Sequence, residues 1–204
     1  MSETSTRSRG RPRHFDEEAV LDELTELFWQ KGYAQTSVSD LVEASGVHKP
    51  SLYRTFGTKE ELFARILRRY LATRMEMFSA LVALAGPGID GIQAFLELLR
   101  GDLVSGTSQN GCLLVNTSSE LSGSAPGFED FGVEYRNELR ERLRVLVSEA
   151  EPENGCDENL TDQRTDLMVT FMFGLTVTTR GGADETEIGR AIDAMHATVD
   201  TWRY

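Results

Sequence analysis

The fold is decided by residues 28–63, FWQKGYAQTSVSDLVEASGVHKPSLYRTFGTKEELF. Within this stretch Ser37 and Asp40 are spaced as a capping box, which predicts the start of a short helix that ends at Gly46. A second short helix is expected at residues 49–55, because proline is tolerated in a first helical turn. Two short helices joined by a tight, glycine-containing turn are a helix-turn-helix candidate.

The second of these helices carries the informative chemistry. Its apolar residues Val47, Leu52 and Phe56 are spaced to face inward. No carboxylate occurs among the residues that can point outward, which are His48, Lys49, Ser51, Tyr53 and Arg54. A cationic, hydroxyl-bearing face of this kind suits DNA phosphates and base edges.

Outside this stretch, apolar residues recur at spacings of three and four, which is typical of amphipathic helices. One helix is expected between Asp16 and Gly32, and a long one from the capping box of Thr58 and Glu61 to about Ala85. We therefore expect an all-α fold of about nine helices, the others lying at about residues 89–104, 112–121, 128–149, 160–180 and 184–203.

Length and composition exclude several classes of protein. The chain has 204 residues, of which 40% are hydrophobic and 26% charged, as in globular proteins with a buried core. No apolar run approaches the roughly 20 residues of a membrane span, and residues 1–14 are too polar for a secretory signal, so a cytoplasmic protein is expected. The two cysteines and three histidines form no metal-binding or catalytic pattern. We expect no metal, no other cofactor and no enzymatic activity.

The net charge of -12 is unevenly distributed. Residues 1–73 hold 11 Lys and Arg and 11 Asp and Glu, whereas residues 74–204 hold 10 and 22. This asymmetry indicates two parts with different partners. The acidic excess of the second part fits either a cationic ligand or a role in solubility.

Residues 28–63 closely resemble the N-terminal DNA-binding domain of TetR-family transcriptional regulators. The resemblance extends over about residues 14–74 and implies three parts: a flexible basic arm at residues 1–13, the helix-turn-helix domain at 14–74, and a ligand-binding and dimerisation domain at 75–204. The features that carry it are Gly32-Tyr33, Thr36-Ser37-Val38, Ala44-x-Gly46-Val47, Ser51-Leu52-Tyr53, Phe56 and Lys59-Glu60-x-Leu62.

The resemblance also implies which residues touch DNA. Lys49, Pro50 and Arg54 fall where family members contact bases, and Ser37, Tyr53 and Lys59 fall where they hold phosphates. The chemistry agrees, since Lys and Arg donate to guanine and a helix N-terminus binds anions. Four further residues complete the predicted DNA-binding surface of the domain: Ser39, His48, Ser51 and Thr58.

Arginines in the N-terminal arm add a second candidate DNA contact. Arg9-Gly10-Arg11-Pro12 resembles the core of an AT-hook, and such arginines favour narrow A/T minor grooves. The alternative is a solubilising tail that attracts DNA without sequence preference.

The resemblance implies a homodimeric regulator, expected to be a repressor, which binds a palindromic DNA operator and is released by a small-molecule effector. In the family the last two long helices pair with those of a second copy. Met and aromatic side chains suit adaptable apolar ligand sites. The expected effector pocket comprises Phe78, Phe95, Leu99, Cys112, Asn116, Phe131, Tyr135, Met172 and Phe173.

Two other hypotheses are weighed against this one. Cys112 could gate a regulator that senses oxidants or electrophiles, although no Lys, Arg or His lies within ten residues to activate its thiol, and free cysteines are mostly buried hydrophobes. The segment Gly86-Pro87-Gly88-Ile89-Asp90-Gly91 fits the pattern GxGxxG of NAD(P)-binding enzymes. No acidic residue follows at the expected distance, so a connector between helices is favoured.

Overall fold

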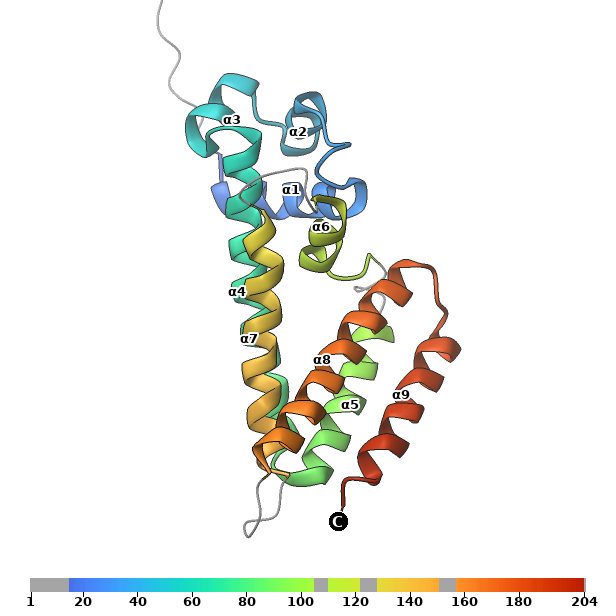
Figure 1. Ribbon diagram of the computed structural model, residues 1–204. Helices are drawn as coiled ribbons and strands as arrows, with labels where there is room; N and C mark the ends of the chain where they lie inside the picture. Colours follow the sequence, from blue (N-terminus) through green and yellow to red (C-terminus); the bar gives the residue numbers. More distant parts are fainter. Residues whose placement is uncertain (1–14, 105–109, 122–127, 151–156, 204) are drawn as a thin grey trace, which may run out of the picture.

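A computed structural model describes residues 15–104, 110–121, 128–150 and 157–203. These residues form nine α-helices and no strand, so the predicted all-α class is confirmed (Figure 1). The helices are α1 Glu17–Lys31, α2 Val38–Ser45, α3 Lys49–Phe56, α4 Lys59–Ala85, α5 Gly88–Val104, α6 Leu113–Leu121, α7 Glu129–Ser148, α8 Glu158–Arg180 and α9 Glu185–Asp200.

Helices α1, α2 and α3 form a head at one end of the molecule (Figure 1). The Asp16 carboxylate caps α1 by accepting from the amides of Glu18 and Ala19. The predicted capping box of Ser37 and Asp40 starts α2, which ends at Gly46 in the left-handed region with φ 62°. Local capping therefore fixes where these helices begin and end.

Helix α4 joins the head to the rest of the chain. It starts at the predicted capping box of Thr58 and Glu61 and continues for 27 residues to Ala85. Its lower part packs against α5 and α7 in the body of the molecule (Figure 1). The boundary that we expect between residues 74 and 75 falls within this helix.

The body consists of α4, α5, α7, α8 and α9 packed side by side, with α6 near the head (Figure 1). Its core is built from wholly buried residues on α5 and α7 that meet others on α8 and α9. Examples with 0% exposure are Ile92, Phe95, Leu139, Leu146, Met168 and Ile192. Among the described helices, none combines the length and hydropathy that a bilayer crossing requires.

The glycine segment at residues 86–91 connects α4 to α5. Its carbonyl at Gly86 lies so close to Gly91 that a Cβ atom added to Gly91 would be 1.9 Å from that oxygen. No strand precedes the segment in the described part of the chain, so the strand-turn-helix unit of a dinucleotide site is missing here. The glycines allow a tight turn between α4 and α5, as the connector interpretation requires.

Candidate nucleic-acid interface

Helix α3 presents the outward face that the sequence predicts. Val47, Leu52 and Phe56 are buried, with 7%, 2% and 6% of their surface exposed. Exposed residues at the start and outer side of the helix are His48, Lys49, Pro50 and Arg54, while Ser51 and Tyr53 are half-buried. The sequence pattern thus separates the core side of α3 from its solvent side correctly.

The cations on this face are not neutralised by neighbouring acids. The Lys49 ammonium lies 5.8 Å from the centre of the Tyr53 ring, and Arg54 Nη2 lies 3.5 Å from Ser51 Oγ. Within the described ranges, no carboxylate forms an ion pair with Lys49 or Arg54. Both positive charges therefore remain available to a polyanion.

The Phe56 ring anchors α3 to its neighbours. This ring lies 6.1 Å from the ring of Phe15, and the Arg65 guanidinium lies 5.2 Å above it. Because Arg65 also pairs with Glu17 at 3.1 Å, α3 is tied to both α1 and α4. The recognition face is consequently held on a rigid support.

Two hydroxyl groups of the predicted DNA-binding surface, those of Ser37 and Thr58, already serve as helix caps. Ser37 Oγ accepts from the amide of Asp40 at 3.2 Å and donates to its carboxylate at 2.7 Å. Thr58 Oγ1 accepts from the amide of Glu61 at 3.2 Å. Ser39 is exposed on α2. Arg9 and Arg11 of the predicted arm lie outside the described residues.

The structure gives Lys59 a role that the sequence does not reveal. Its ammonium donates to the carbonyl oxygen of Tyr33 at 2.7 Å and lies 4.2 Å from the centre of the Tyr33 ring. Burial lowers the pKa of this ammonium. Lys59 thus joins the start of α4 to the loop before α2, and its predicted phosphate contact stays a prediction.

The same loop is bound to the body through Glu120 at the end of α6. The Glu120 carboxylate accepts from the backbone amides of Tyr33 at 3.1 Å and Ala34 at 2.7 Å. Nearby, Trp29 Nε1 donates to the carbonyl of Asn110, which also accepts from Arg180. Sequence reasoning missed these residues, because partners 81 to 87 positions apart leave no local pattern.

A cluster of aromatic rings reinforces this junction of head and body. The Phe63 ring on α4 lies 4.7 Å from that of Phe28 on α1 and 4.9 Å from that of Tyr33. On the body side, the Phe128 ring just before α7 lies 5.4 Å from Phe63 and 5.3 Å from Tyr33. Head and body therefore share one continuous core.

Tyr33 should ionise late in an alkaline titration. Burial and a 3.0 Å hydrogen bond to Glu60, together with the Glu60 charge, raise its pKa to about 12. Since the ordinary tyrosine pKa is about 10, the stability that Tyr33 contributes is complete below pH 10 and is lost as the pH rises toward 12. We expect Tyr33→Phe to remove one late phenolate transition from the absorbance at 295 nm. A titration curve that loses an early transition instead would contradict this assignment.

The residues expected to form an effector pocket lie in the interior of the body and at its junction with the head. Phe173 and Tyr135 are brought together, with ring centres 5.5 Å apart. Phe131 lies beside Phe128 at the head junction, and half-buried Asn116 donates to the carbonyl of Asn110. The remaining members of the set are buried: Phe78, Phe95, Leu99, Cys112 and Met172.

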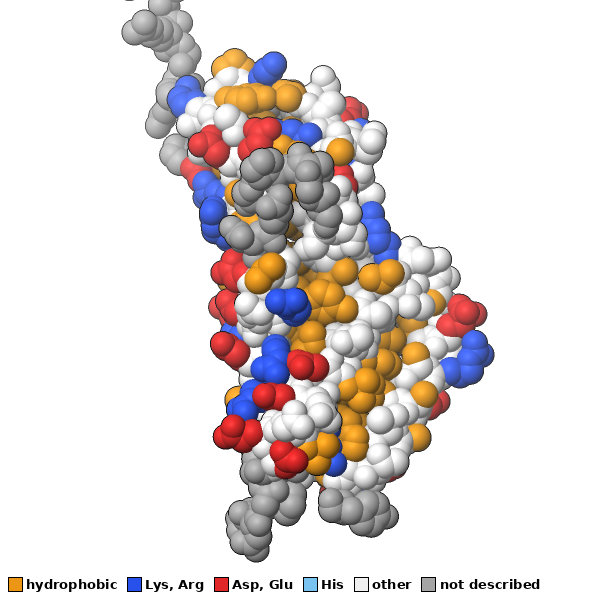
Figure 2. Space-filling model, in the orientation of Figure 1, with side chains coloured by type: hydrophobic (Ala, Val, Ile, Leu, Met, Phe, Trp, Pro, Cys, Tyr) orange, Lys and Arg blue, Asp and Glu red, His pale blue; other side chains and the backbone are white. Residues whose placement is uncertain are grey.

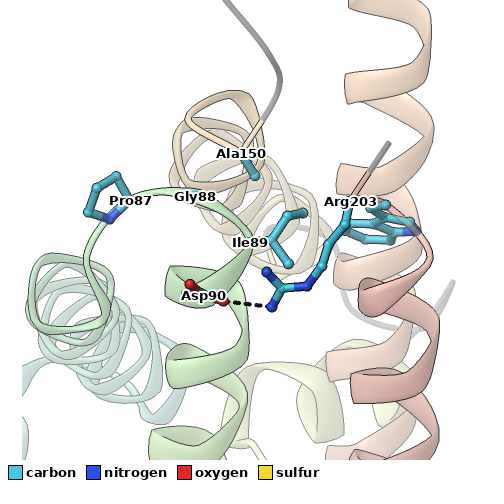
Figure 3. A pocket seen from close by; sticks show the side chains of 7 residues that line it. Pro87, Gly88, Ile89, Asp90, Ala150 and Arg203 are labelled. Carbon is cyan, nitrogen blue, oxygen red and sulfur yellow. Dashed lines mark hydrogen bonds and ion pairs between the residues drawn. The ribbon is translucent and has the colours of Figure 1, made fainter.

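A separate depression of about 440 Å³ lies beside the glycine segment (Figure 3), where α4 is followed by α5 at the end of the body remote from the head (Figure 1). Its lining includes Gly88, Ile89, Asp90, Trp202 and Arg203. Figure 3 shows the Arg203 side chain directed at Asp90, and their ion pair measures 2.6 Å. A carboxylate in the first turn of α5 disfavours phosphate at that helix end, which argues further against a dinucleotide there.

Comparison with known proteins identifies relatives of the head. Residues 20–66 match the family model described as "Bacterial regulatory proteins, tetR family". The chain is 37% identical over 117 residues to the HTH-type transcriptional repressor ComR of Escherichia coli (strain K12), an alignment that covers 57% of this chain and 56% of ComR. It therefore spans little more than half the length of that relative.

Other similarities extend over most of the chain. The HTH-type transcriptional repressor BdcR of Escherichia coli (strain K12) is 26% identical over 183 residues, covering 89% of this chain and 88% of BdcR. A cysteine mutant of the TetR family transcriptional regulator CifR, solved with 26-bp double-strand operator DNA, superposes with a TM-score of 0.73 and 27% identity. That superposition covers 90% of this chain and 99% of CifR.

Proposed function

Because the chain belongs to the TetR family of bacterial regulatory proteins, we propose that it is a ligand-responsive transcriptional repressor that binds operator DNA as a homodimer. The observation that carries this proposal is the outward face of α3, where Lys49 and Arg54 are exposed and no acid neutralises them within the described residues. The similar regulator CifR is solved with double-strand operator DNA, which supports DNA as the partner.

The proposed mode of binding places α3 in the major groove. Lys49, Pro50 and Arg54 then face base edges, while Tyr53 and Ser37 lie nearer the phosphates. Two copies reading a palindrome need their recognition helices about 34–36 Å apart, the length of one helical turn of DNA. The head, residues 14–74, is the DNA-binding part of this proposal, and residues 75–204 are the ligand-binding and dimerisation part.

We assign dimerisation to α8 and α9. Figure 2 shows hydrophobic side chains gathered over the body, and on α8 Leu167 and Val177 are 42% and 55% exposed. Exposed apolar side chains on one helix favour its packing against a second copy. This arrangement would present both heads on the same side of the dimer.

Effector release would act through the junction between head and body. The Glu120 carboxylate links α6 to the loop before α2, and α4 runs unbroken from the head into the body. An effector that binds better to one arrangement of these helices shifts the spacing of the two recognition helices, with couplings typically of about 1–3 kcal/mol.

The two other hypotheses receive less support. Cys112 is only 1% exposed, so an electrophile would not reach its thiol without movement of the chain. The glycine segment connects two helices, and the named relatives are repressors rather than enzymes. We propose a regulatory role without enzymatic activity, exercised in the cytoplasm where the operator DNA is found.

Fluorescence anisotropy on DNA from the protein's own upstream region tests this function. Lys49→Ala should weaken specific binding by about 1–3 kcal/mol, roughly 5- to 150-fold, because a base contact is lost. Wild-type affinity should fall steeply as salt rises, because bound phosphates release counterions. The matched control is Arg136→Ala, which removes an exposed cation from α7 in the body and should leave the affinity unchanged.

Two results would contradict the proposal. Equal affinities of wild type and Lys49→Ala, across the upstream DNA and a randomised operator library, would remove α3 as the recognition helix. A loss as large in Arg136→Ala as in Lys49→Ala would mean that binding follows total charge rather than the α3 face.

A further inference from the structure

A largely buried arginine in the body has fewer partners than its charge requires. Arg74 on α4 exposes only 15% of its side chain, yet its ion pair with Asp102 is long, at 3.8 Å. Its Nη1 also approaches the sulfur of Met77, a weak acceptor, at 3.6 Å. Its Nε has no hydrogen-bond partner among the described residues and is shielded from solvent.

Other buried donors converge on the same place from different elements. Tyr70 lies one helical turn before Arg74 on α4, Tyr135 comes from α7, and both interact with Cys112. Burial is the main cause that raises the pKa of both tyrosines, so each keeps its proton at neutral pH. Burial by itself lowers the pKa of Arg74, but the Coulombic interactions with Tyr70, Cys112, Tyr135 and Asp102 together raise it.

The geometry of Arg74 differs from that of a structural arginine. Arg100 on α5 also has a shielded Nε, but carboxylate oxygens of Glu97 and Asp193 lie 3.2 Å and 2.5 Å from its guanidinium. Arg74 has one distant carboxylate and a thioether. A buried donor without an acceptor is destabilising, and an incoming acceptor removes that cost.

We propose that Arg74, Tyr70 and Tyr135 form the recognition site for a small organic anion, a carboxylate on an aromatic-sized apolar group. The proposal rests on the proposed function, since this anion would be the effector. The carboxylate would accept from Arg74 Nε and from a tyrosine hydroxyl, as charge-assisted hydrogen bonds are the strongest available. The charged groups facing the site are Arg74 from α4 and Asp102 from α5, and the titratable ones are Tyr70, Cys112 and Tyr135.

Aromatic side chains surround these donors and fit the apolar part of such a ligand. The Arg74 guanidinium lies 5.3 Å from the Phe78 ring centre, and the Tyr135 ring lies 5.5 Å from that of Phe173. The Trp29 ring contacts the Tyr70 ring edge-on at 5.4 Å. A surface depression of about 190 Å³ between α1 and α4 is lined in part by Tyr70.

Trp29 provides a direct optical reporter of the site. The chain has two tryptophans, and Trp202 lies in the distant depression of Figure 3, so Trp202→Phe leaves Trp29 as the sole fluorophore of its kind. In this background the protein is titrated with benzoate and phenylacetate, and with benzamide and phenylacetamide as neutral equivalents. We expect a saturable change in Trp29 emission with the carboxylates and an affinity at least about tenfold weaker for the amides.

Variants then assign the binding to Arg74. Arg74→Met should weaken carboxylate binding by about tenfold or more, to the level of the amides. Arg100→Met is the matched control and should leave carboxylate binding unchanged. If Arg74→Met does not fold, Tyr70→Phe and Tyr135→Phe take its place, and each should weaken the carboxylates more than the amides.

The proposal is overturned if neither carboxylate gives a saturable change, if acids and amides bind equally, or if Arg74→Met retains wild-type affinity. Operator binding by anisotropy is measured on the same samples. Wild-type protein that binds operator DNA while neither carboxylate binds would reject this site and leave the repressor proposal standing. Carboxylate binding by a wild-type protein without operator affinity would support this site and contradict the repressor proposal.

Discussion

Phe63→Ala is expected to lower the free energy of unfolding by about 3–5 kcal/mol. The Phe63 side chain is 1% exposed, and its ring contacts those of Phe28, Tyr33 and Phe128 at 4.7, 4.9 and 5.4 Å. Truncation leaves a cavity whose walls come from three separate elements, none of which can close it alone. Urea denaturation followed by circular dichroism measures the loss.

Phe63 also joins the head to the body, because Phe128 belongs to the body side of the cluster. The wild-type protein should therefore unfold with the head and body coupled, and Phe63→Ala should separate the transition seen by Trp29 from that seen by Trp202. Phe63→Leu is the control, since it keeps much of the apolar volume and should cost less than half as much. A loss below about 1 kcal/mol in the alanine variant would show that the cluster contributes little.

Gly91→Ala is expected to destabilise the protein by about 2–3 kcal/mol, although alanine has a higher helix propensity than glycine. In an unobstructed helix, alanine is more favourable than glycine by about 1 kcal/mol. At Gly91, however, the added Cβ would stand 1.9 Å from the carbonyl oxygen and 2.7 Å from the carbonyl carbon of Gly86. Both are backbone atoms at the junction of α4 and α5, so relief requires the two helices to move apart.

The matched control is Gly101→Ala, ten residues further along the same helix. No heavy atom lies within 4 Å of a Cβ built there, so this substitution should raise the free energy of unfolding by about 0.5–1 kcal/mol. Thermal and urea unfolding of both variants measure the difference. If both substitutions stabilised the protein, the close approach of Gly91 to the Gly86 carbonyl would not exist in solution.

The beginnings and ends of the head helices could be predicted from the sequence because they depend on neighbours in the chain. Ser37 with Asp40 and Thr58 with Glu61 satisfy free amides three residues away, so the signal and the contact lie in the same few residues. The inward and outward faces of α3 follow from the same local periodicity. Each of these predictions agrees with the structure.

The junction and the buried cluster could not be predicted in this way. Glu120 binds amides 86 and 87 positions earlier, and Asp102 and Tyr135 approach Arg74 from α5 and α7, which only the packed body brings to α4. The expected effector pocket contained Tyr135 and Cys112 but not Arg74, because hydrophobicity and aromatic content were the available signals. A buried charge becomes informative only when its partners in three dimensions are known.

Because charge is unevenly distributed along the molecule, the influence of the acidic body on bound DNA depends on the ionic strength. The acidic excess belongs to residues 74–204, whereas α3 lies within residues 1–73, whose acidic and basic residues are equal in number, and the 27 residues of α4 that link the head to the body span about 40 Å. At physiological ionic strength the Debye length is about 8 Å, so DNA held by the head does not feel most of the body. At about 0.01 M salt it reaches 30 Å, and repulsion between the body and the phosphates opposes the attraction of the head. The molecule thus limits its own nonspecific attachment to nucleic acid as counterions become scarce.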